Sequence, residues 1–87
     1  MSKIGKLLER LLSRPADFTW NELIRILNHF GYIEVKSGKT GGSRRKYADK
    51  EKQIINLHKP HPGNILKRYA LDQVISTLKE RGHLKDE

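Results

Sequence analysis

The sequence lacks cysteine altogether and contains only three prolines among its 87 residues. The absence of cysteine excludes disulfides, thiolate nucleophiles and cysteine-ligated zinc. No apolar run approaches the roughly 18 residues that a membrane-spanning helix needs, and no signal-peptide pattern opens the chain. We therefore expect a single globular domain over residues 1–87, located in the cytoplasm and with no membrane partner.

Acidic residues are outnumbered by basic residues, and the basic residues are unevenly distributed. The chain has 18 Lys and Arg against 10 Asp and Glu, a formal net charge of +8. Residues 36–68 hold ten of the basic and two of the acidic residues, so this segment alone carries +8. Such clustering is typical of surfaces that bind a phosphate backbone. We predict RNA as the partner; a DNA-binding repressor fits the charge equally well, but no recognition-helix signature favours it.

The N-terminal segment has the apolar spacing of an amphipathic helix, which we predict over residues 3–14. Its apolar positions follow the pattern i, i+3, i+4, i+7 and i+8: Ile4, Leu7, Leu8, Leu11 and Leu12. Pro15 cannot continue this helix. We expect the helix to pack on the domain core, with a membrane-surface or partner-binding role as the alternative.

A second helix is predicted from signals at both of its ends. Thr19 and Glu22 have the spacing of a capping box, and Phe18 and Leu23 that of a hydrophobic staple. Gly31 is the expected C-terminal stop, because this position commonly needs a positive φ. The predicted buried face comprises Trp20, Leu23, Ile24, Leu27 and Phe30.

The remainder of the chain predicts three strands and a last helix. Residues 32–37, 43–48 and 53–58 have the composition of strands, the second being the weakest candidate. Residues 64–69 form either a helical turn or an irregular entry to a helix that ends near Gly82. That helix has an apolar face formed by Leu71, Val74, Ile75 and Leu78. Short links favour an antiparallel meander with the helices on one face, an α+β fold whose outer sheet face carries the basic residues.

Four motifs occur in a fixed order along residues 17–84: Phe18-x-Trp20-x-Glu22-Leu23, Leu27-x-x-Phe30-Gly31-Tyr32, Gly42-Ser43 before a basic strand, and a His/Pro segment. Together they resemble the HicA-like family of mRNA interferase toxins. The resemblance implies an α-β-β-β-α core like that of a double-stranded-RNA-binding domain, here with an additional N-terminal helix. It also implies metal-independent cleavage of mRNA, and neutralisation by a HicB-like antitoxin protein.

The chain departs from the family at its most informative position. The family motif is Gly-Ser-His with a catalytic His, whereas here Ser43 is followed by Arg44. Arginine cannot act as a general base, but it can bind phosphate and stabilise charge on a phosphorane. His58 and His61, on either side of Pro60, are then the candidate acid/base groups, with RNA contact or a structural role as alternatives. The predicted RNA-binding residues are Lys39, Thr40, Ser43, Arg44, Arg45, Lys46, Lys59, Lys67 and Arg68.

We expect neither a metal nor another cofactor, because no third ligand stands close in sequence to His58-x-x-His61. The predicted function is therefore that of a type II toxin that binds mRNA and cleaves it as an endoribonuclease. The alternative is a non-catalytic RNA-binding module, or a basic subunit held by a protein partner.

Overall fold

The computed structural model describes residues 3–35, 44–60 and 63–84. It confirms the predicted α+β class and the α-β-β-β-α order after an N-terminal helix. The elements are α1 (Lys3–Leu12), α2 (Trp20–His29), β1 (Ile33–Val35), β2 (Arg44–Ala48), β3 (Ile54–His58) and α3 (Arg68–Glu80).

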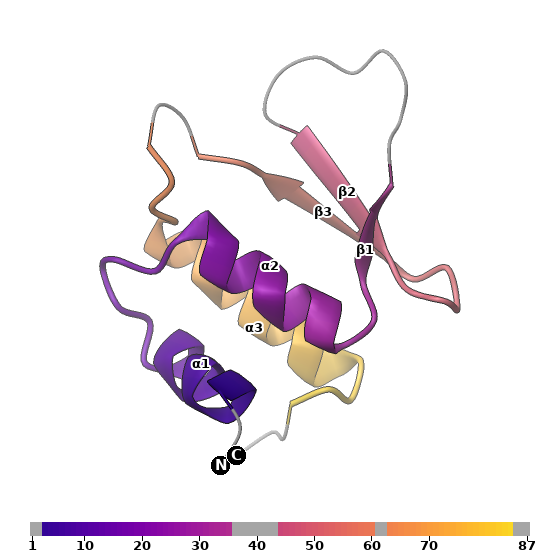
Figure 1. Ribbon diagram of the computed structural model, residues 1–87, viewed down its shortest axis with the longest axis horizontal. Coiled ribbons are helices and arrows are strands. Elements are labelled where there is room, and N and C mark those ends of the chain that lie inside the picture. The colour runs from indigo at the N-terminus through magenta and orange to yellow at the C-terminus, as the bar shows by residue number, and fades with distance from the viewer. Residues whose placement is uncertain (1–2, 36–43, 61–62, 85–87) are drawn as a thin grey trace.

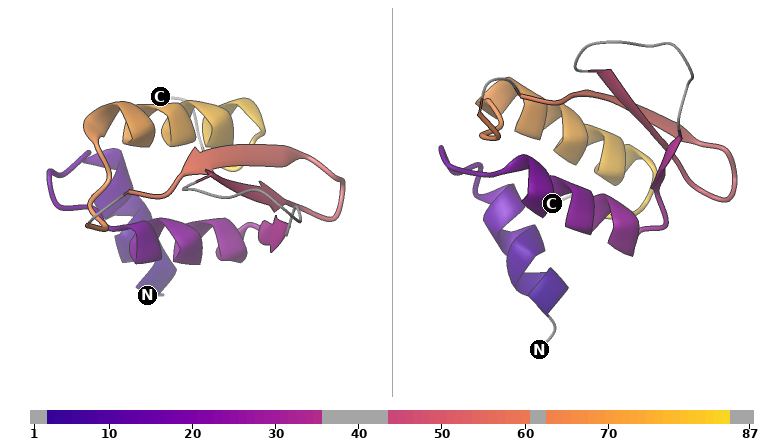
Figure 2. Two further views of the ribbon diagram at one scale, coloured as in Figure 1. Left: turned by 90° about the horizontal axis from the view of Figure 1, so that it is seen from above. Right: turned by 45° about the horizontal axis from the view of Figure 1, so that its top comes forward.

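The helices α2 and α3 run in the same direction, and both lie on one side of the sheet (Figures 1 and 2). Helix α1 packs against the other side of this helix pair, in contact with both of its members. The pair is therefore covered by the sheet on one side and by α1 on the other. None of the helices in the described part of the chain is long and apolar enough to cross a bilayer.

The three strands form an antiparallel meander in the order β1-β2-β3, as predicted. Tyr47 of β2 lies directly opposite Ile55 of β3, and both side chains are buried. This pair identifies the face of the sheet that packs on the helices, because side chains alternate between the two faces of a strand. The other face is turned away from the core.

Helix α2 begins with the predicted capping box. The Glu22 N–H donates to Thr19 Oγ1 at 3.2 Å, and the Thr19 N–H donates to Glu22 Oε1 at 2.9 Å. Gly31 follows the C-cap with φ +93°, the left-handed conformation expected there.

The buried face of α2 is only partly the predicted one. Trp20, Leu23 and Leu27 are buried, but Ile24 and Phe30 are only partly so, and the fully buried Ile26 was missed. Ile26 lies one turn after Glu22, a residue that bonds to α1, and so belongs to a second stripe that faces α1. A helix that packs against neighbours on two sides needs apolar residues around more of its circumference than a single stripe provides.

Helix α1 packs on the core, as predicted, but ends at Leu12 rather than at residue 14. Leu11 is fully buried, whereas Leu12 is 40% exposed, so the prediction that Leu12 belongs to the apolar face is wrong. Arg14 has φ +51°, and its guanidinium forms an ion pair with Asp72 of α3. This contact attaches the end of α1 to the third helix.

The predicted apolar face of α3 is buried, and Gly82 follows its end with φ +82°. The segment before α3 is extended: Ile65 forms a β-bridge with Thr19, and Lys67 is the N-cap residue. Of the two predicted alternatives for residues 64–69, the structure therefore shows the irregular entry for the segment that precedes Arg68.

One ionic cluster joins α1 to the start of α2. Arg10 Nε donates to Glu22 Oε2 at 2.7 Å, and Arg10 Nη2 lies 3.1 Å from Asp17 Oδ1. The hydrogen bond from Arg10, followed by those from Thr19, lowers the pKa of Glu22 to about 2, although partial burial opposes this shift. The same carboxylate therefore caps α2 and anchors α1.

Adjacent leucines on α1 provide a matched test of its packing. We expect Leu11→Ala to lower the free energy of unfolding by about 2–4 kcal/mol, because it leaves a cavity in the core. Leu12→Ala should change it by less than about 1 kcal/mol. Urea denaturation of both variants measures the difference. Equal losses would contradict the placement of α1.

The lowered pKa of Glu22 predicts how stability depends on pH. Because the folded-state pKa lies below the ordinary value of 4.5, this stabilisation is complete above about pH 5 and is lost as the pH falls towards 2. We expect Glu22→Gln to destabilise the protein by about 1–2 kcal/mol at neutral pH, with the difference disappearing near pH 2. The control is Glu9→Gln, at an exposed position of α1. A pH-independent effect at Glu22 would show that the carboxylate charge is unimportant.

Candidate nucleic-acid interface

The register of the sheet places two of the predicted site residues directly opposite each other. Arg44, the first residue of β2, pairs with His58, the last residue of β3. Both side chains are exposed on the face that points away from the helices, since Tyr47 and Ile55 occupy the other face. Directly opposite residues of antiparallel strands have Cβ atoms about 4.5–5.5 Å apart. A guanidinium and an imidazole can therefore act on the same phosphate group.

The next row on the outer face is mixed, with polar residues on β2 and β3 and Val35 on β1, and the far end is apolar. Lys46 lies opposite Asn56 of β3 and Val35 of β1. The row beyond it crosses all three strands with Ile33, Ala48 and Ile54. Ile33 is 69% exposed and Ile54 43% exposed, so the outer face changes from cationic to apolar along the strands. The prediction of a basic outer face thus holds for the end that carries Arg44.

Arg45 and Tyr47 lie on the inner face, as their alternation with Arg44 and Lys46 predicts. Tyr47 is 4% exposed and packs edge-to-face on Trp20, with ring centroids 6.3 Å apart. Burial raises the pKa of its hydroxyl. Arg45 lies 3.6 Å from Glu34 of β1 in an ion pair. Tyr47 is therefore a core residue, and Arg45 is directed away from the surface that Arg44 and Lys46 share.

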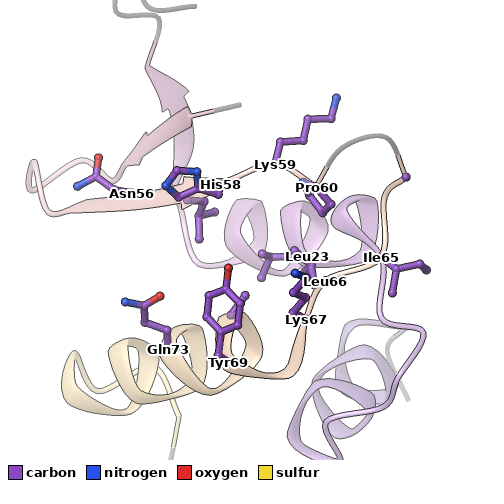
Figure 3. Close-up of a pocket in the computed structure, with 13 residues that line it drawn as sticks. Leu23, Asn56, His58, Lys59, Pro60, Ile65, Leu66, Lys67, Tyr69 and Gln73 are labelled. Carbon is purple, nitrogen blue, oxygen red and sulfur yellow. The ribbon is translucent and has the colours of Figure 1, made fainter. Parts of the chain in front are cut away.

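A pocket of about 510 Å³ lies between β3 and the first turns of α3 (Figure 3). It brings together three predicted site residues from two segments: His58 and Lys59 at the end of β3, and Lys67 before α3. Its apolar lining comes from Leu23, Leu57, Ile65, Leu66 and Ala70. Arg68 follows Lys67 and is exposed, but it does not line the pocket.

The first turn of α3 adds to the positive potential at this pocket. It contains no acidic side chain, and Lys67 as N-cap makes no side-chain capping bond. The unpaired N–H groups of a helix start carry a partial positive charge that favours anions. Lys67 and Arg68 add two formal charges at the same place, so the site is suited to a phosphate.

Backbone hydrogen bonds hold the start of α3 beside that of α2. Trp20 N–H donates to the Asn64 carbonyl at 2.7 Å, and Leu66 N–H donates to the Phe18 carbonyl at 2.8 Å. This pairing places Leu66 against Leu23 at the back of the pocket. Asn64 takes part in this pairing through its backbone carbonyl. The N-cap residue of α3 is Lys67, whose side chain does not cap the helix.

Several predicted site residues lie outside the described part of the chain: Lys39, Thr40, Ser43 and His61. Of the other two histidines, His29 is exposed at the end of α2. His83 stacks on Phe30 and has Nε2 3.1 Å from the Tyr32 hydroxyl. Neither of these two histidines lines the pocket.

Two exposed residues of α3 that line the pocket were not predicted from the sequence. Tyr69 is 67% exposed, and it points with Gln73 from α3 towards β3 (Figure 3). The sequence does contain a sign that these two residues share an exposed surface. Both fall outside the apolar positions of α3, and they are one helical turn apart. An aromatic residue on the exposed side of a helix, next to Lys67 and Arg68, is typical of a contact surface.

A family model described as the HicA toxin of bacterial toxin–antitoxin systems matches residues 20–82. The matched range includes all three strands, α3 and every residue that lines the pocket. Comparisons with curated proteins and with solved structures give no match.

Proposed function

This chain belongs to the HicA toxin family of bacterial toxin–antitoxin systems, and we propose that it binds mRNA and cleaves it as a metal-independent endoribonuclease. The observation that carries the proposal is the direct opposition of Arg44 and His58 on the outer face of the sheet. At this end of the strands, His58 is a group that can transfer a proton, and Arg44 is a permanently charged cation. An mRNA substrate also implies that the protein acts in the cytoplasm.

The reaction that suits these groups is an internal transfer within the RNA. The 2′-hydroxyl attacks the adjacent phosphorus, the P–O5′ bond breaks, and the products carry a 2′,3′-cyclic phosphate and a 5′-hydroxyl. One group takes the proton of the 2′-hydroxyl, and another gives a proton to the leaving O5′. His58 is the candidate for one of these roles and His61 for the other. Arg44 stabilises the negative charge that develops on the phosphorane oxygens.

Binding of the RNA backbone is assigned to the cations around the pocket. Lys59 and Lys67 line it, and Arg68 is exposed beside Lys67. Together with Arg44, these residues offer four candidate phosphate contacts. Of the other predicted contacts, Lys46 shares the outer face with Arg44.

The partner of the toxin is an antitoxin, for which we propose a HicB-like protein. Such a protein neutralises the toxin if it covers the outer face of the sheet with acidic groups opposite Arg44 and apolar groups opposite Ile33 and Ile54. Both halves of that face are exposed in the structure.

Cleavage is tested by incubating the protein with a long RNA in the presence of EDTA. We expect fragments with a cyclic phosphate, and a rate about 10²–10⁴-fold lower for His58→Ala, because a general acid or base is lost. Arg44→Lys should also slow cleavage, since it keeps the charge but not the forked geometry. Lys50→Ala, at an exposed position in the β2–β3 turn, is the control.

Two outcomes would contradict this assignment. Normal cleavage by both His58→Ala and His61→Ala would remove the two histidines from the mechanism. Intact RNA that is nevertheless retarded on a gel would support the alternative of a non-catalytic RNA-binding module. That alternative is motivated by Arg44, which follows Ser43 where the family motif has a His.

The salt dependence of binding measures the phosphate contacts. Four contacts to a single strand should give a slope of log K against log salt of about −3. Lys67→Ala should make the slope less steep by about 0.7, whereas Lys50→Ala should leave it unchanged. Fluorescence anisotropy with a labelled RNA at several salt concentrations gives both values. A flat response of the unmodified protein would argue against nucleic acid as the ligand.

A further inference from the structure

We propose that the pocket between β3 and α3 binds one unpaired nucleobase of a single-stranded RNA, with Tyr69 as its stacking surface. The inference rests on the proposed RNA-binding function and goes beyond it, because it identifies where a base is held.

The pocket combines an apolar interior with an exposed aromatic ring. Leu23, Leu57 and Leu66 contribute apolar side chains, and Tyr69 extends from α3 towards His58 (Figure 3). Within the described residues, the Tyr69 hydroxyl has no hydrogen-bond partner, and the side chain is 67% exposed. A large ring left at the mouth of an apolar pocket is suited to stacking, and single-stranded RNA is commonly recognised through bases stacked on aromatic side chains.

The edge of β3 offers hydrogen-bonding groups to a planar ligand. The Ile54 carbonyl accepts a bond from Arg81 Nη2 at 2.8 Å, so it points away from β2. Backbone groups alternate along a strand, and those of Asn56 and His58 therefore point to the same free edge. In the described part of the chain they have no backbone partner there. Gln73, which points towards this edge, adds a carboxamide that can donate and accept.

The open part of this edge is too short for an added peptide strand. At one end of this edge, the Ile54 carbonyl already accepts a hydrogen bond from Arg81. At the other end, Pro60 has no N–H group that could donate one. Only the groups of Asn56 and His58 remain between them. A nucleobase has the required size and presents donors and acceptors along one edge.

The charges at the rim select for RNA over an uncharged aromatic ligand. Lys59 and Lys67 line the pocket on its β3 and α3 sides, and Arg44 lies opposite His58. A base in the pocket therefore has cations available for its flanking phosphates. A base bound in the pocket also places the RNA chain next to His58, where the proposed cleavage takes place.

The experiment compares a labelled single-stranded RNA with the same RNA annealed to its complement. We expect Tyr69→Leu to weaken single-strand binding about 5- to 100-fold, as loss of one stacked base does, with no effect on the duplex. Tyr69→Phe is the matched control and should bind normally, because it keeps the ring. Tyr69→Leu should also leave the salt slope unchanged, in contrast to Lys67→Ala.

The outcomes separate this inference from the proposed function. Unchanged single-strand affinity of Tyr69→Leu, in a protein that still binds and cleaves RNA, would overturn the base pocket alone. Failure of the unmodified protein to bind any RNA would overturn both. An equal loss for single strand and duplex would also contradict the inference, since a paired base cannot enter the pocket. Because Tyr69 is exposed, thermal unfolding of the variants should be close to that of the unmodified protein.

Discussion

The arrangement of the candidate site depends on a short backbone pairing between two segments that are far apart in the sequence. Phe18–Trp20 and Asn64–Leu66 exchange two hydrogen bonds, from Trp20 to the Asn64 carbonyl and from Leu66 to the Phe18 carbonyl. The pairing fixes the starts of α2 and α3 relative to each other. Leu23 and Leu66 then form the back of the pocket, and Lys67 and Tyr69 are placed opposite β3. The pairing, together with the buried face of α3, therefore positions the first turn of α3 relative to His58.

The second determinant is the register of β2 and β3. Tyr47 and Ile55 form a buried cross-strand pair, and their packing on the helices decides which face of each strand is turned outward. A slip by one residue would move Arg44 or Lys46 into the core and expose Tyr47, at a large energetic cost. The same core contact that stabilises the fold therefore keeps Arg44 opposite His58. Among the described residues no polar or charged side chain is buried, so the cations of the site remain at the surface.

The outer face of the sheet also offers a physical basis for the two proposed partners of this small domain. Its cationic end, with Arg44 and His58, adjoins the pocket and suits a phosphate backbone. Its apolar end, with Ile33, Ala48 and Ile54, suits a protein surface. A protein bound across both ends would exclude RNA from the first, which is a simple physical basis for neutralisation of the proposed activity.

The sequence by itself determined the features that depend on neighbouring residues. The capping box of Thr19 and Glu22, the stop at Gly31, the apolar face of α3 and the alternation of Arg44 with Arg45 are all local, and all are found in the structure. The α+β class and the family follow from the order of these local signals. Only the tertiary structure decided the features that depend on contacts between distant segments. It buries Ile26 and leaves Leu12 exposed because α1 packs against α2, and it makes Asn64–Leu66 extended because that segment pairs with Phe18–Trp20. The role of Tyr69 is of the same kind, since a ring on the exposed side of a helix becomes part of a pocket only when a strand edge lies opposite it.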